Sequence, residues 1–257
     1  MLIPLRNYSN YSICESNIKI DDLVNFAEKE KLPAIALTDY KLLSGVLEFS
    51  IKCQKKGIQP IIGLDVDYLS ILKNNSRLTI LSKNENGFKN LNILSTKINT
   101  ENDFQLSLKN IKDFSDGNIL ILGGLYSYFE DLNINKNNLK LILDEINTLK
   151  KTFNSDIFFE LDDYLDNKLL NEISQKCNIN CFLSSFSFYK QDKDFDAIKI
   201  LHCLKNGEYL QNTSFKLKNN YSLAQSHQNI DKFNQLIQNS NFISNKINFL
   251  IEEKNIT

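Results

Sequence analysis

Residues 34–65 read AIALTDYKLLSGVLEFSIKCQKKGIQPIIGLD, and this stretch holds one strand–helix–strand pattern. Residues 34–38 are a short apolar run typical of a buried strand, and residues 59–65 form a second such run. Between them, residues 43–56 carry apolar side chains at helical spacing, and Gly57 follows where a glycine commonly ends a helix. Two strands joined by a crossover helix pair in parallel, so the stretch predicts a βαβ unit.

The same alternation continues on both sides of this unit. Further strands are predicted at residues 2–6, 118–122, 156–161 and 181–184, with a hairpin formed by residues 66–72 and 77–82. Helices are predicted at residues 21–31, 87–99, 106–114, 138–153, 167–176, 194–204 and 230–250. The alternation indicates an α/β fold with a parallel sheet, either doubly wound or closed into a barrel, and we favour the barrel. No linker-like stretch divides the chain, so we expect residues 1–257 to form a single domain.

Length and composition exclude several classes of protein. The chain has 257 residues, of which 42% are hydrophobic and 24% charged, and a chain this long buries enough surface to fold without a disulfide or a metal. Its formal charge of −1 gives no basic excess for neutralising phosphates, so we expect little direct DNA binding. No apolar run approaches the roughly 18–20 residues that span a bilayer, and the N-terminus lacks the pattern of a secretory signal. We therefore expect a cytoplasmic globular protein that does not bind membranes.

Several stretches of the chain resemble a known family. They begin with PLRNYSNYSICES at residues 4–16, IKIDDLVNFAEKEKLPAIALTDYKLLSGVLEF at residues 18–49 and KKGIQPIIGLDVDY at residues 55–68. The similarity continues through IFFELDDY at residues 157–164 and CFLSSFSFY at residues 181–189. Through them the chain resembles the PHP (polymerase and histidinol phosphatase) domain at the N-terminus of the bacterial DNA polymerase III alpha subunit. The resemblance implies a distorted, TIM-like (β/α)7 barrel, which agrees with the predicted strands and helices.

The chemistry of this family depends on histidine, carboxylate and cysteine ligands at the C-terminal ends of the barrel strands. They bind two or three divalent metals, which generate hydroxide from water near neutral pH and hold a phosphoester for attack. The positions of this chain that match those ligands hold Arg6, Tyr8, Glu15, Tyr40, Asp65, Gly124, Tyr164, Phe186 and Phe188.

No histidine remains at any matching position, and only Glu15 and Asp65 keep a metal-competent carboxylate. Two carboxylates without imidazole make a weak site, and Arg6 places a permanent positive charge where a cation would bind. The resemblance therefore implies vestigial metal-site positions with no bound metal, no cofactor and no catalytic residue. We expect aromatic rings to fill the former cavity at the barrel mouth, contributed by Tyr8, Tyr40, Tyr164, Phe186 and Phe188.

Histidine, serine and glycine residues elsewhere have structural interpretations that we favour over catalytic ones. His202 is predicted to lie in a helix with no nearby nucleophile, and His227 lies in an exposed polar stretch. Ser9 and Ser12 lack a histidine partner. The Gly123-Gly124 pair lacks the residues that complete a phosphate-binding loop.

Carboxylates and cysteines also favour structural roles. The carboxylates that could form acid–base pairs or bind Mg²⁺ are Asp39, Asp65, Asp67, Asp162 and Asp163. We interpret them as polar residues at strand ends, with Asp39 bound to a neighbouring loop. The five cysteines form no CxxC pair and are expected to be reduced and buried. Cys177 and Cys181 could act together as ligands, but the residues between them favour a turn from a helix into a strand.

The resemblance implies a non-catalytic structural and interaction module of the replicative DNA polymerase III alpha subunit, which supports DNA replication. The parent protein would be a DNA-directed DNA polymerase with its polymerising carboxylates beyond residue 257. The implied partners are the remainder of the alpha subunit and, secondarily, the proofreading exonuclease subunit. Two alternatives stay open. One is a metal-dependent phosphoesterase or proofreading exonuclease of the PHP family, and the other is a free-standing PHP-like protein whose pocket binds a small ligand.

Overall fold

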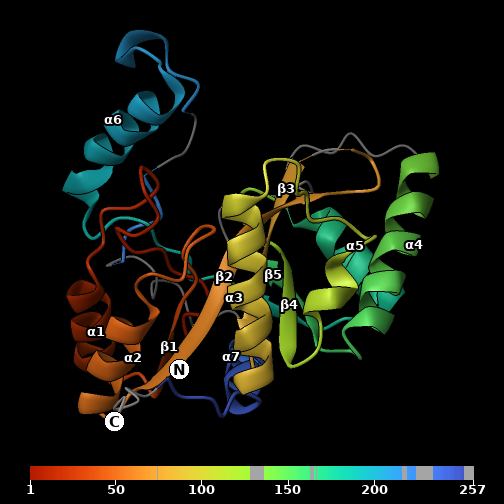
Figure 1. Cartoon of the computed structure of the whole chain (residues 1–257), viewed down its shortest axis with the longest axis horizontal. Helices are drawn as coiled ribbons and strands as arrows, with labels where there is room; N and C mark the ends of the chain where they lie inside the picture. The colour runs from red at the N-terminus through yellow and green to blue at the C-terminus, as the bar shows by residue number, and fades with distance from the viewer. Residues whose placement is uncertain are drawn as a thin grey trace.

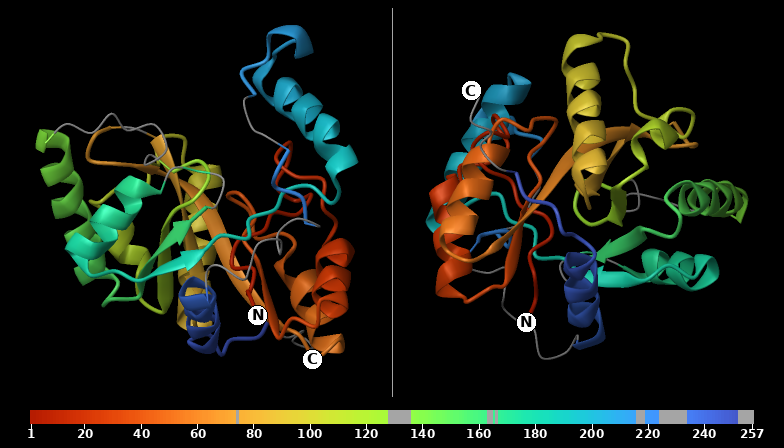
Figure 2. Two further views of the ribbon diagram at one scale, coloured as in Figure 1. Left: turned by 180° about the vertical axis from the view of Figure 1, so that it is seen from behind. Right: turned by 60° about the horizontal axis from the view of Figure 1, so that its bottom comes forward.

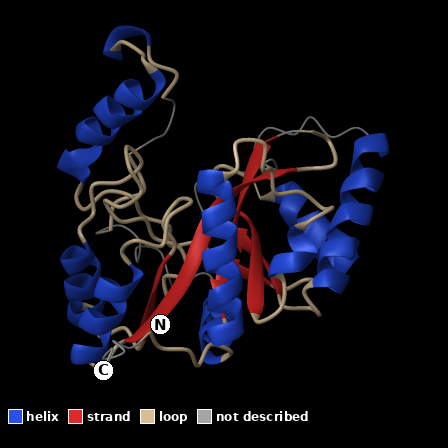
Figure 3. Ribbon diagram, in the orientation of Figure 1, coloured by secondary structure: helices blue, strands red, loops and turns tan. Residues whose placement is uncertain are grey.

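The computed structural model describes residues 1–73, 75–127, 136–162, 165, 167–215, 219–223 and 234–251. Its strands form one six-stranded sheet in chain order, made of β1 (Ala34–Leu37), β2 (Gln59–Leu69), β3 (Asn75–Ser82), β4 (Asn118–Gly123), β5 (Ile157–Leu161) and β6 (Cys181–Leu183). The helices are α1 (Ile20–Lys29), α2 (Val46–Lys55), α3 (Glu85–Thr100), α4 (Lys136–Thr152), α5 (Lys168–Cys177), α6 (Phe195–Asn206) and α7 (Asn234–Asn245). Short 3₁₀ turns are η1 (Ile111–Phe114), η2 (Asp192–Asp194) and η3 (Leu210–Asn212). Figures 1 and 3 show helices on both sides of the curled sheet.

The sheet is mixed, which corrects the expectation of a parallel sheet outside the predicted hairpin. β1 pairs parallel with β2, and β4, β5 and β6 pair parallel in sequence. β3 is antiparallel to both of its neighbours, β2 and β4. The connection between β2 and β3 is too short for a crossover helix, so the chain can only turn back on itself. The predicted hairpin is thereby confirmed, and β2 continues without interruption from the predicted strand at residues 59–65 into it.

The N-terminal segment runs beside the sheet without being a strand of it. The predicted strand at residues 2–6 is not formed, but the carbonyl oxygens of Pro4 and Asn7 accept hydrogen bonds from Ala36 N and Thr38 N of the β1 side, each at 2.9 Å. On the other side, Tyr8 N donates to the carbonyl oxygen of Ser187, which follows β6, at 3.1 Å. The segment therefore lies between the two edge strands of the curled sheet, β1 and β6. The end of the sheet where these two strands finish, near Thr38 and Ser187, is here called the mouth.

Local hydrogen bonds explain where several helices begin and end. Asn84 precedes α3, and its side chain accepts from Gly87 N at 3.0 Å, which caps the helix. The predicted helix at residues 106–114 shortens to η1, because the side chain of Asn110 accepts from Ser107 N at 2.9 Å and favours a turn. Within the predicted helix at residues 230–250, the structure describes residues 234–250, and the helix there is α7, which ends at Asn245. Of the helices described, none is long and apolar enough to cross a membrane.

The cysteines were expected to be reduced and buried, and the structure agrees except at Cys14. α5 ends at Cys177 and β6 begins at Cys181, which confirms the predicted turn between a helix and a strand. All five cysteines are free. Four are buried, whereas Cys14 is partly exposed and adopts a left-handed backbone with φ +61°.

The inner face of the curled sheet changes from apolar to polar along its strands. At the end away from the mouth, this face packs against the N-terminal segment and against residues 243–247. The side chains that form this contact are Ile3, Leu5, Ala34, Ala36, Ile61, Leu81, Ile119, Ile121, Phe158, Phe182, Ile243 and Ile247. Because side chains alternate along a strand, the next inward positions after Ile61 and Phe158 include Asp65 on β2 and Glu160 on β5. These charged residues are buried at the mouth of the sheet.

Gly87→Ala is expected to destabilise the protein more than Gly207→Ala. At Gly87 an added Cβ would lie 2.1 Å from the carbonyl oxygen of Gly117, so backbone would have to move. At Gly207, which has φ +65°, an added Cβ meets nothing within 4 Å. Only the left-handed conformation then costs free energy, about 1–2 kcal/mol. Urea-induced unfolding measures both variants, and equal losses would contradict the close approach at Gly87.

Candidate functional site

A buried arginine joins two strands at the mouth of the sheet. Arg6 enters from the N-terminal segment, and its Nη2 donates to Asp65 Oδ2 of β2 at 3.0 Å. Its Nη1 donates to Glu160 Oε2 of β5 at 3.0 Å and to the carbonyl oxygen of Leu125 at 3.1 Å. The three charged side chains are at most 2% exposed. One guanidinium group therefore pairs with two carboxylates that burial would otherwise leave without a cation.

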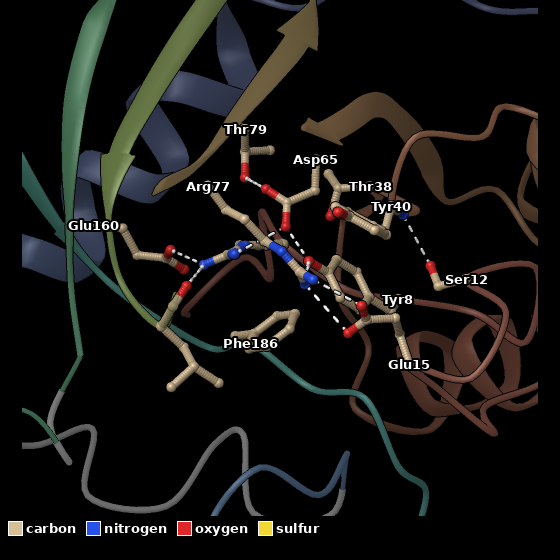
Figure 4. Close-up of polar contacts among 12 residues, drawn as sticks. Tyr8, Ser12, Glu15, Thr38, Tyr40, Asp65, Arg77, Thr79, Glu160 and Phe186 are labelled. Carbon is tan, nitrogen blue, oxygen red and sulfur yellow. Dashed lines mark hydrogen bonds and ion pairs between the residues drawn. The ribbon is translucent and has the colours of Figure 1, made fainter. Parts of the chain in front are cut away.

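A second arginine, Arg77, lies near the start of β3 and holds the carboxylate of Glu15 (Figure 4). Its Nη2 and Nη1 lie 2.7 Å and 3.2 Å from the two oxygens of Glu15, a two-pronged geometry that a guanidinium supplies and an ammonium does not. Nη1 also donates to the hydroxyl of Tyr8 at 3.2 Å. The guanidinium carbon lies 3.9 Å from the ring centroid of Tyr40 and 4.5 Å from that of Tyr126. Two aromatic rings thus cover this cation.

Asp65 binds Arg6 directly and is linked to Arg77 through the hydroxyl of Tyr8; Figure 4 labels Asp65, Tyr8 and Arg77. It accepts hydrogen bonds from Arg6, from the hydroxyl of Tyr8 and, at 2.9 Å, from Thr79 Oγ1. The register of β2 and β3 places Asp65 opposite Thr79 and Asp67 opposite the second arginine. Because side chains alternate along each strand, these four residues face the same side of the sheet. Strand pairing therefore assembles the centre of a group of charged side chains around Arg6 and Arg77, here called the cluster.

The charges of the cluster balance. Its ion pairs join Arg6 to Asp65 and Glu160, Arg77 to Glu15 and Asp67, Lys205 to Glu15, and Lys41 to Asp67. Four cationic side chains thus meet four carboxylates. A network of this kind is stable in a buried place only while every member keeps its partner.

The pKa values reflect burial and the neighbouring charges. Burial alone would raise the pKa of Glu15, but Arg77 and Lys205 lower it below its ordinary value. At Glu160, burial outweighs the attraction of Arg6 and raises the pKa of the carboxyl group. Burial would lower the pKa of Arg6, but the adjacent carboxylates raise it well above its ordinary value. Arg6 is therefore a permanent cation in this site.

Aromatic rings pack beside the guanidinium groups. Tyr8 and Phe186 form an edge-to-face pair with ring centroids 4.8 Å apart, and the guanidinium carbon of Arg6 lies 4.5 Å from the ring centroid of Phe186. Phe188 lies one layer further from the cluster and packs on Phe186 at 5.5 Å. These three rings are at most 3% exposed and fill space next to the charges.

The remaining predicted positions divide between the cluster and the undescribed residues. Gly124 has φ +66°, and a Cβ there would lie 2.1 Å from Glu160 Oε2, so the glycine leaves room for that carboxylate. Tyr40 is partly buried and donates to Asp67 Oδ2 at 2.7 Å. Tyr164 lies outside the described residues. The predicted positions that the structure brings together are Arg6, Tyr8, Glu15, Tyr40, Asp65, Gly124 and Phe186.

The side chains at the mouth do not fit a divalent metal centre. The four carboxylates of the cluster are paired with guanidinium or ammonium groups, and no imidazole contacts them among the described residues. A hard cation would have to displace these groups and would meet the charge of Arg6. Within the described ranges, no group of three or more His, Cys, Asp or Glu could hold a metal ion. The cluster is an ion-pair network built from the protein's own cations.

Five charged members of the cluster are missing from the predicted vestigial metal-site positions, namely Lys41, Asp67, Arg77, Glu160 and Lys205. The sequence carries a signal for two of them, Arg77 and Glu160. Composition carries a signal for the first: the chain has 30 basic residues, and only Arg6 and Arg77 are arginines. A chain that uses lysine almost everywhere keeps arginine where a planar, forked donor is needed. The signal for Glu160 is its place as the charged residue of the apolar strand IFFEL.

His202 has a hydroxyl close to it, so the prediction of no nearby nucleophile was wrong. Ser214 Oγ lies 3.1 Å from His202 Nε2, and it also contacts Glu208 Oε1 at 2.6 Å. A catalytic triad places its carboxylate on the second ring nitrogen of the histidine, whereas here the carboxylate binds the serine. These contacts hold the returning chain against α6. His227 lies outside the described residues.

The predicted role of Asp39 is confirmed. Its carboxylate accepts from Ser9 Oγ at 2.7 Å and from Ser12 Oγ at 2.6 Å, which ties the loop after the N-terminal segment to the end of β1. Asp162 is buried after β5, and Asp163 lies outside the described residues. The serines therefore act as hydrogen-bond donors to a strand-end carboxylate.

Arg6→Met is expected to lower the free energy of unfolding by about 3–5 kcal/mol, because two buried carboxylates lose their cation. Arg6→Lys keeps the charge without the fork and should lose an intermediate amount. Lys89→Met removes an exposed pair with Glu85 and is the control, with an expected change below about 1 kcal/mol. Urea-induced unfolding at pH 7 measures all three. A loss for Arg6→Met no larger than that of the control would contradict the bridging role.

Glu15→Gln is expected to destabilise the protein at neutral pH and to lose that effect in acid. The pKa of Glu15 in the folded protein lies below its ordinary value of 4.5. Its ion pairs therefore stabilise the fold fully above that value, and the stabilisation disappears as the pH falls through the folded-state pKa. Unfolding measured from pH 7 down to about pH 3 should show the wild type and the variant converging. Glu172→Gln, on the surface beside Lys176, is the control. A gap that stays constant with pH would speak against these pairs.

Comparison with known proteins supplies the family and the relatives. The PHP domain family model matches residues 4–164. The DNA polymerase III subunit alpha of Buchnera aphidicola subsp. Acyrthosiphon pisum is 30% identical over 238 residues, which cover 87% of this chain and 20% of that protein. The DNA polymerase III subunit alpha of Borreliella burgdorferi is 28% identical over 228 residues, covering 80% of this chain and 19% of that protein. This chain thus spans about a fifth of the length of these curated relatives.

A solved structure shares the fold. An amidohydrolase from Chromobacterium violaceum, with bound sulfate and no metal, superposes with a TM-score of 0.51 and 10% identity, covering 78% of this chain and 97% of that one. Identity this low shows a likeness of fold alone. The family match extends over more than half of the sequence, from the N-terminal segment with Arg6 through β5 with Glu160. The chain belongs to the PHP domain family, as a module similar to that of DNA polymerase III alpha subunits.

Proposed function

We propose that the chain is a non-catalytic PHP module of a DNA polymerase III alpha subunit and serves DNA replication as a structural and interaction module. The observation that carries the proposal is the arginine pair. Arg6 and Arg77 supply the positive charge that divalent metals supply elsewhere in the family, according to the resemblance. A guanidinium does not activate water as a metal does, so the cluster offers no hydroxide nucleophile.

The position of the cluster supports a structural role. Arg6 ties the N-terminal segment to β2 and β5, and Arg77 ties β3 to the loop that carries Glu15. These segments are distant in sequence, and the two arginines hold them together at the mouth. An interaction module needs this rigidity because partners bind a surface of fixed shape at a lower entropic cost.

The proposal also covers the finer architecture and the setting of the chain. It takes residues 1–257 as one domain with a closed (β/α)7 barrel. The N-terminal segment would take the position of the seventh strand, which its hydrogen bonds to Ala36, Thr38 and Ser187 support. It places the protein in the cytoplasm, as part of a DNA-directed DNA polymerase. The proposed partners are the remainder of the alpha subunit and the proofreading exonuclease subunit. A formal charge of −1 favours protein partners over DNA.

The test of the non-catalytic role is metal retention together with hydrolysis. After dialysis against Zn²⁺ or Mn²⁺ and then against metal-free buffer, elemental analysis should find well below half an equivalent of metal. A genuine zinc site, with a binding free energy of roughly 10–16 kcal/mol, would not lose its ion. The same protein should hydrolyse 3′-mismatched primers and small phosphate esters no faster than background, with or without Mn²⁺.

Variants separate a real activity from contamination. A contaminating nuclease would not respond to Glu15→Gln or Asp65→Asn, whereas an activity of this site would be lost. Circular dichroism establishes that each variant is folded. Turnover that disappears in a folded variant would overturn the non-catalytic proposal in favour of the metal-dependent phosphoesterase or exonuclease. Stoichiometric metal would do the same.

A further inference from the structure

Residues 192–215, here called the arm, project from the body of the protein at the mouth of the sheet (Figures 1 and 2). The arm contains η2, α6 and η3. It is joined to the body at its base, where Asp192 accepts from Ser222 Oγ at 2.8 Å and the rings of Phe195 and Tyr189 lie 5.8 Å apart. Most of α6 lies away from the sheet and the other helices in both figures.

The arm holds its shape through contacts of its own. Gly207 ends α6 in a left-handed conformation, and the chain then returns along the helix. The carboxylate of Glu208 accepts from Ser214 N at 2.8 Å and from Ser214 Oγ at 2.6 Å. The ring of Phe215 lies 5.7 Å from that of Phe195. The returning chain is therefore an ordered part of the arm.

Exposed apolar side chains are concentrated on the arm. Twelve large apolar side chains are exposed within the described ranges, and four of them lie between residues 200 and 210, namely Ile200 at 44%, Leu204 at 71%, Tyr209 at 80% and Leu210 at 48%. Ile200 and Leu204 are one helical turn apart and share a face of α6, and the other two follow directly after the helix. Apolar residues gathered in this way mark an interaction surface.

The cluster at the mouth fixes this surface to the body. Lys205, the neighbour of Leu204, pairs with the Glu15 carboxylate that Arg77 also holds. The ammonium of Lys205 lies 5.1 Å from the ring centroid of Tyr40. The direction of α6 is thus coupled to the arginine network.

We propose that the arm docks onto another part of the same polypeptide and that the arginine network holds the arm in its docking position. This inference rests on the proposed function, under which the chain is one part of a polypeptide about five times its length. The occupant presents an apolar surface that covers Leu204 and Tyr209, with polar groups at its rim. The former metal site then contributes to assembly through Lys205 and Glu15.

The size of the face favours an occupant in the same chain. Four exposed side chains offer on the order of 300–600 Å², whereas each side of a stable complex between separate proteins covers roughly 800 Å². Covalent linkage raises the effective concentration of the two surfaces, so a smaller contact is enough between domains of one chain. A second copy or a separate subunit would need more surface than the arm provides.

Cysteine labelling in the whole alpha polypeptide that carries this chain tests the inference. Tyr209→Cys reports on the arm, and Ile93→Cys reports on an exposed position of α3, where Ile93 is 50% exposed. Maleimide labelling is followed by peptide mass spectrometry, which measures each cysteine separately. Relative to the 257-residue chain alone, Tyr209→Cys should label at least about tenfold more slowly in the whole polypeptide, because docking must open before the thiol reacts. Labelling within about threefold in the two settings would overturn the inference.

Further measurements identify the occupant and the role of the cluster. Protection that disappears on dilution would mean a second copy and would overturn the choice of occupant, since contacts within one chain do not depend on concentration. Leu204→Asp should restore fast labelling, while Leu141→Asp on α4 should not. Lys205→Met should increase labelling several-fold, and Lys199→Met on the same helix is its control. Equal effects of the two lysine variants would overturn the role of the arginine network. None of these outcomes alters the metal and hydrolysis measurements, so the proposed function is judged separately.

Discussion

The pairing of buried carboxylates with guanidinium groups is the interaction on which the mouth of this protein depends. Asp65 and Glu160 are inward positions of β2 and β5, and strand alternation gives them no other direction. Burial disfavours an ionised carboxylate unless a cation or hydrogen-bond donors offset the loss of water. Arg6 provides that cation for both, and doing so fixes the N-terminal segment between the two ends of the curled sheet.

Under the proposed function, arginine takes the place of a metal in charge but not in chemistry. A divalent ion takes oxygen and nitrogen ligands from several directions and activates water, whereas a guanidinium binds in one plane and keeps its protons. This difference explains the aromatic neighbours, since the flat faces of the guanidinium groups pack against Phe186, Tyr40 and Tyr126. It also explains why only Arg6 and Arg77 are arginines among 30 basic residues. The ion pairs of the site connect segments that are distant in sequence, and its donors do not suit a metal.

The sequence predicted elements better than pairing. The apolar runs of β1, β4, β5 and β6 and the helical spacing of α2 and α5 are local patterns, so they could be recognised without the fold. The antiparallel setting of β3 and the loss of strand geometry at residues 2–6 depend on neighbours, which local patterns do not contain. Arg77 was missed for the same reason, because its partner Glu15 is 62 residues away in the chain.

The sequence by itself determined the family, the alternation of strands and helices, and the absence of histidine from the positions that match the family's ligands by resemblance, because each is a property of residue types and their spacing. It also determined that Arg6 carries a permanent charge, since a guanidinium does not titrate in proteins. Only the tertiary structure decided which carboxylates pair with that charge, that Arg77 and Glu160 belong to the cluster, and that Lys205 joins α6 to it. The physical reason is that ion pairing depends on distance in space, which the curling of the sheet and the register of β2 and β3 set and which the order of residues does not.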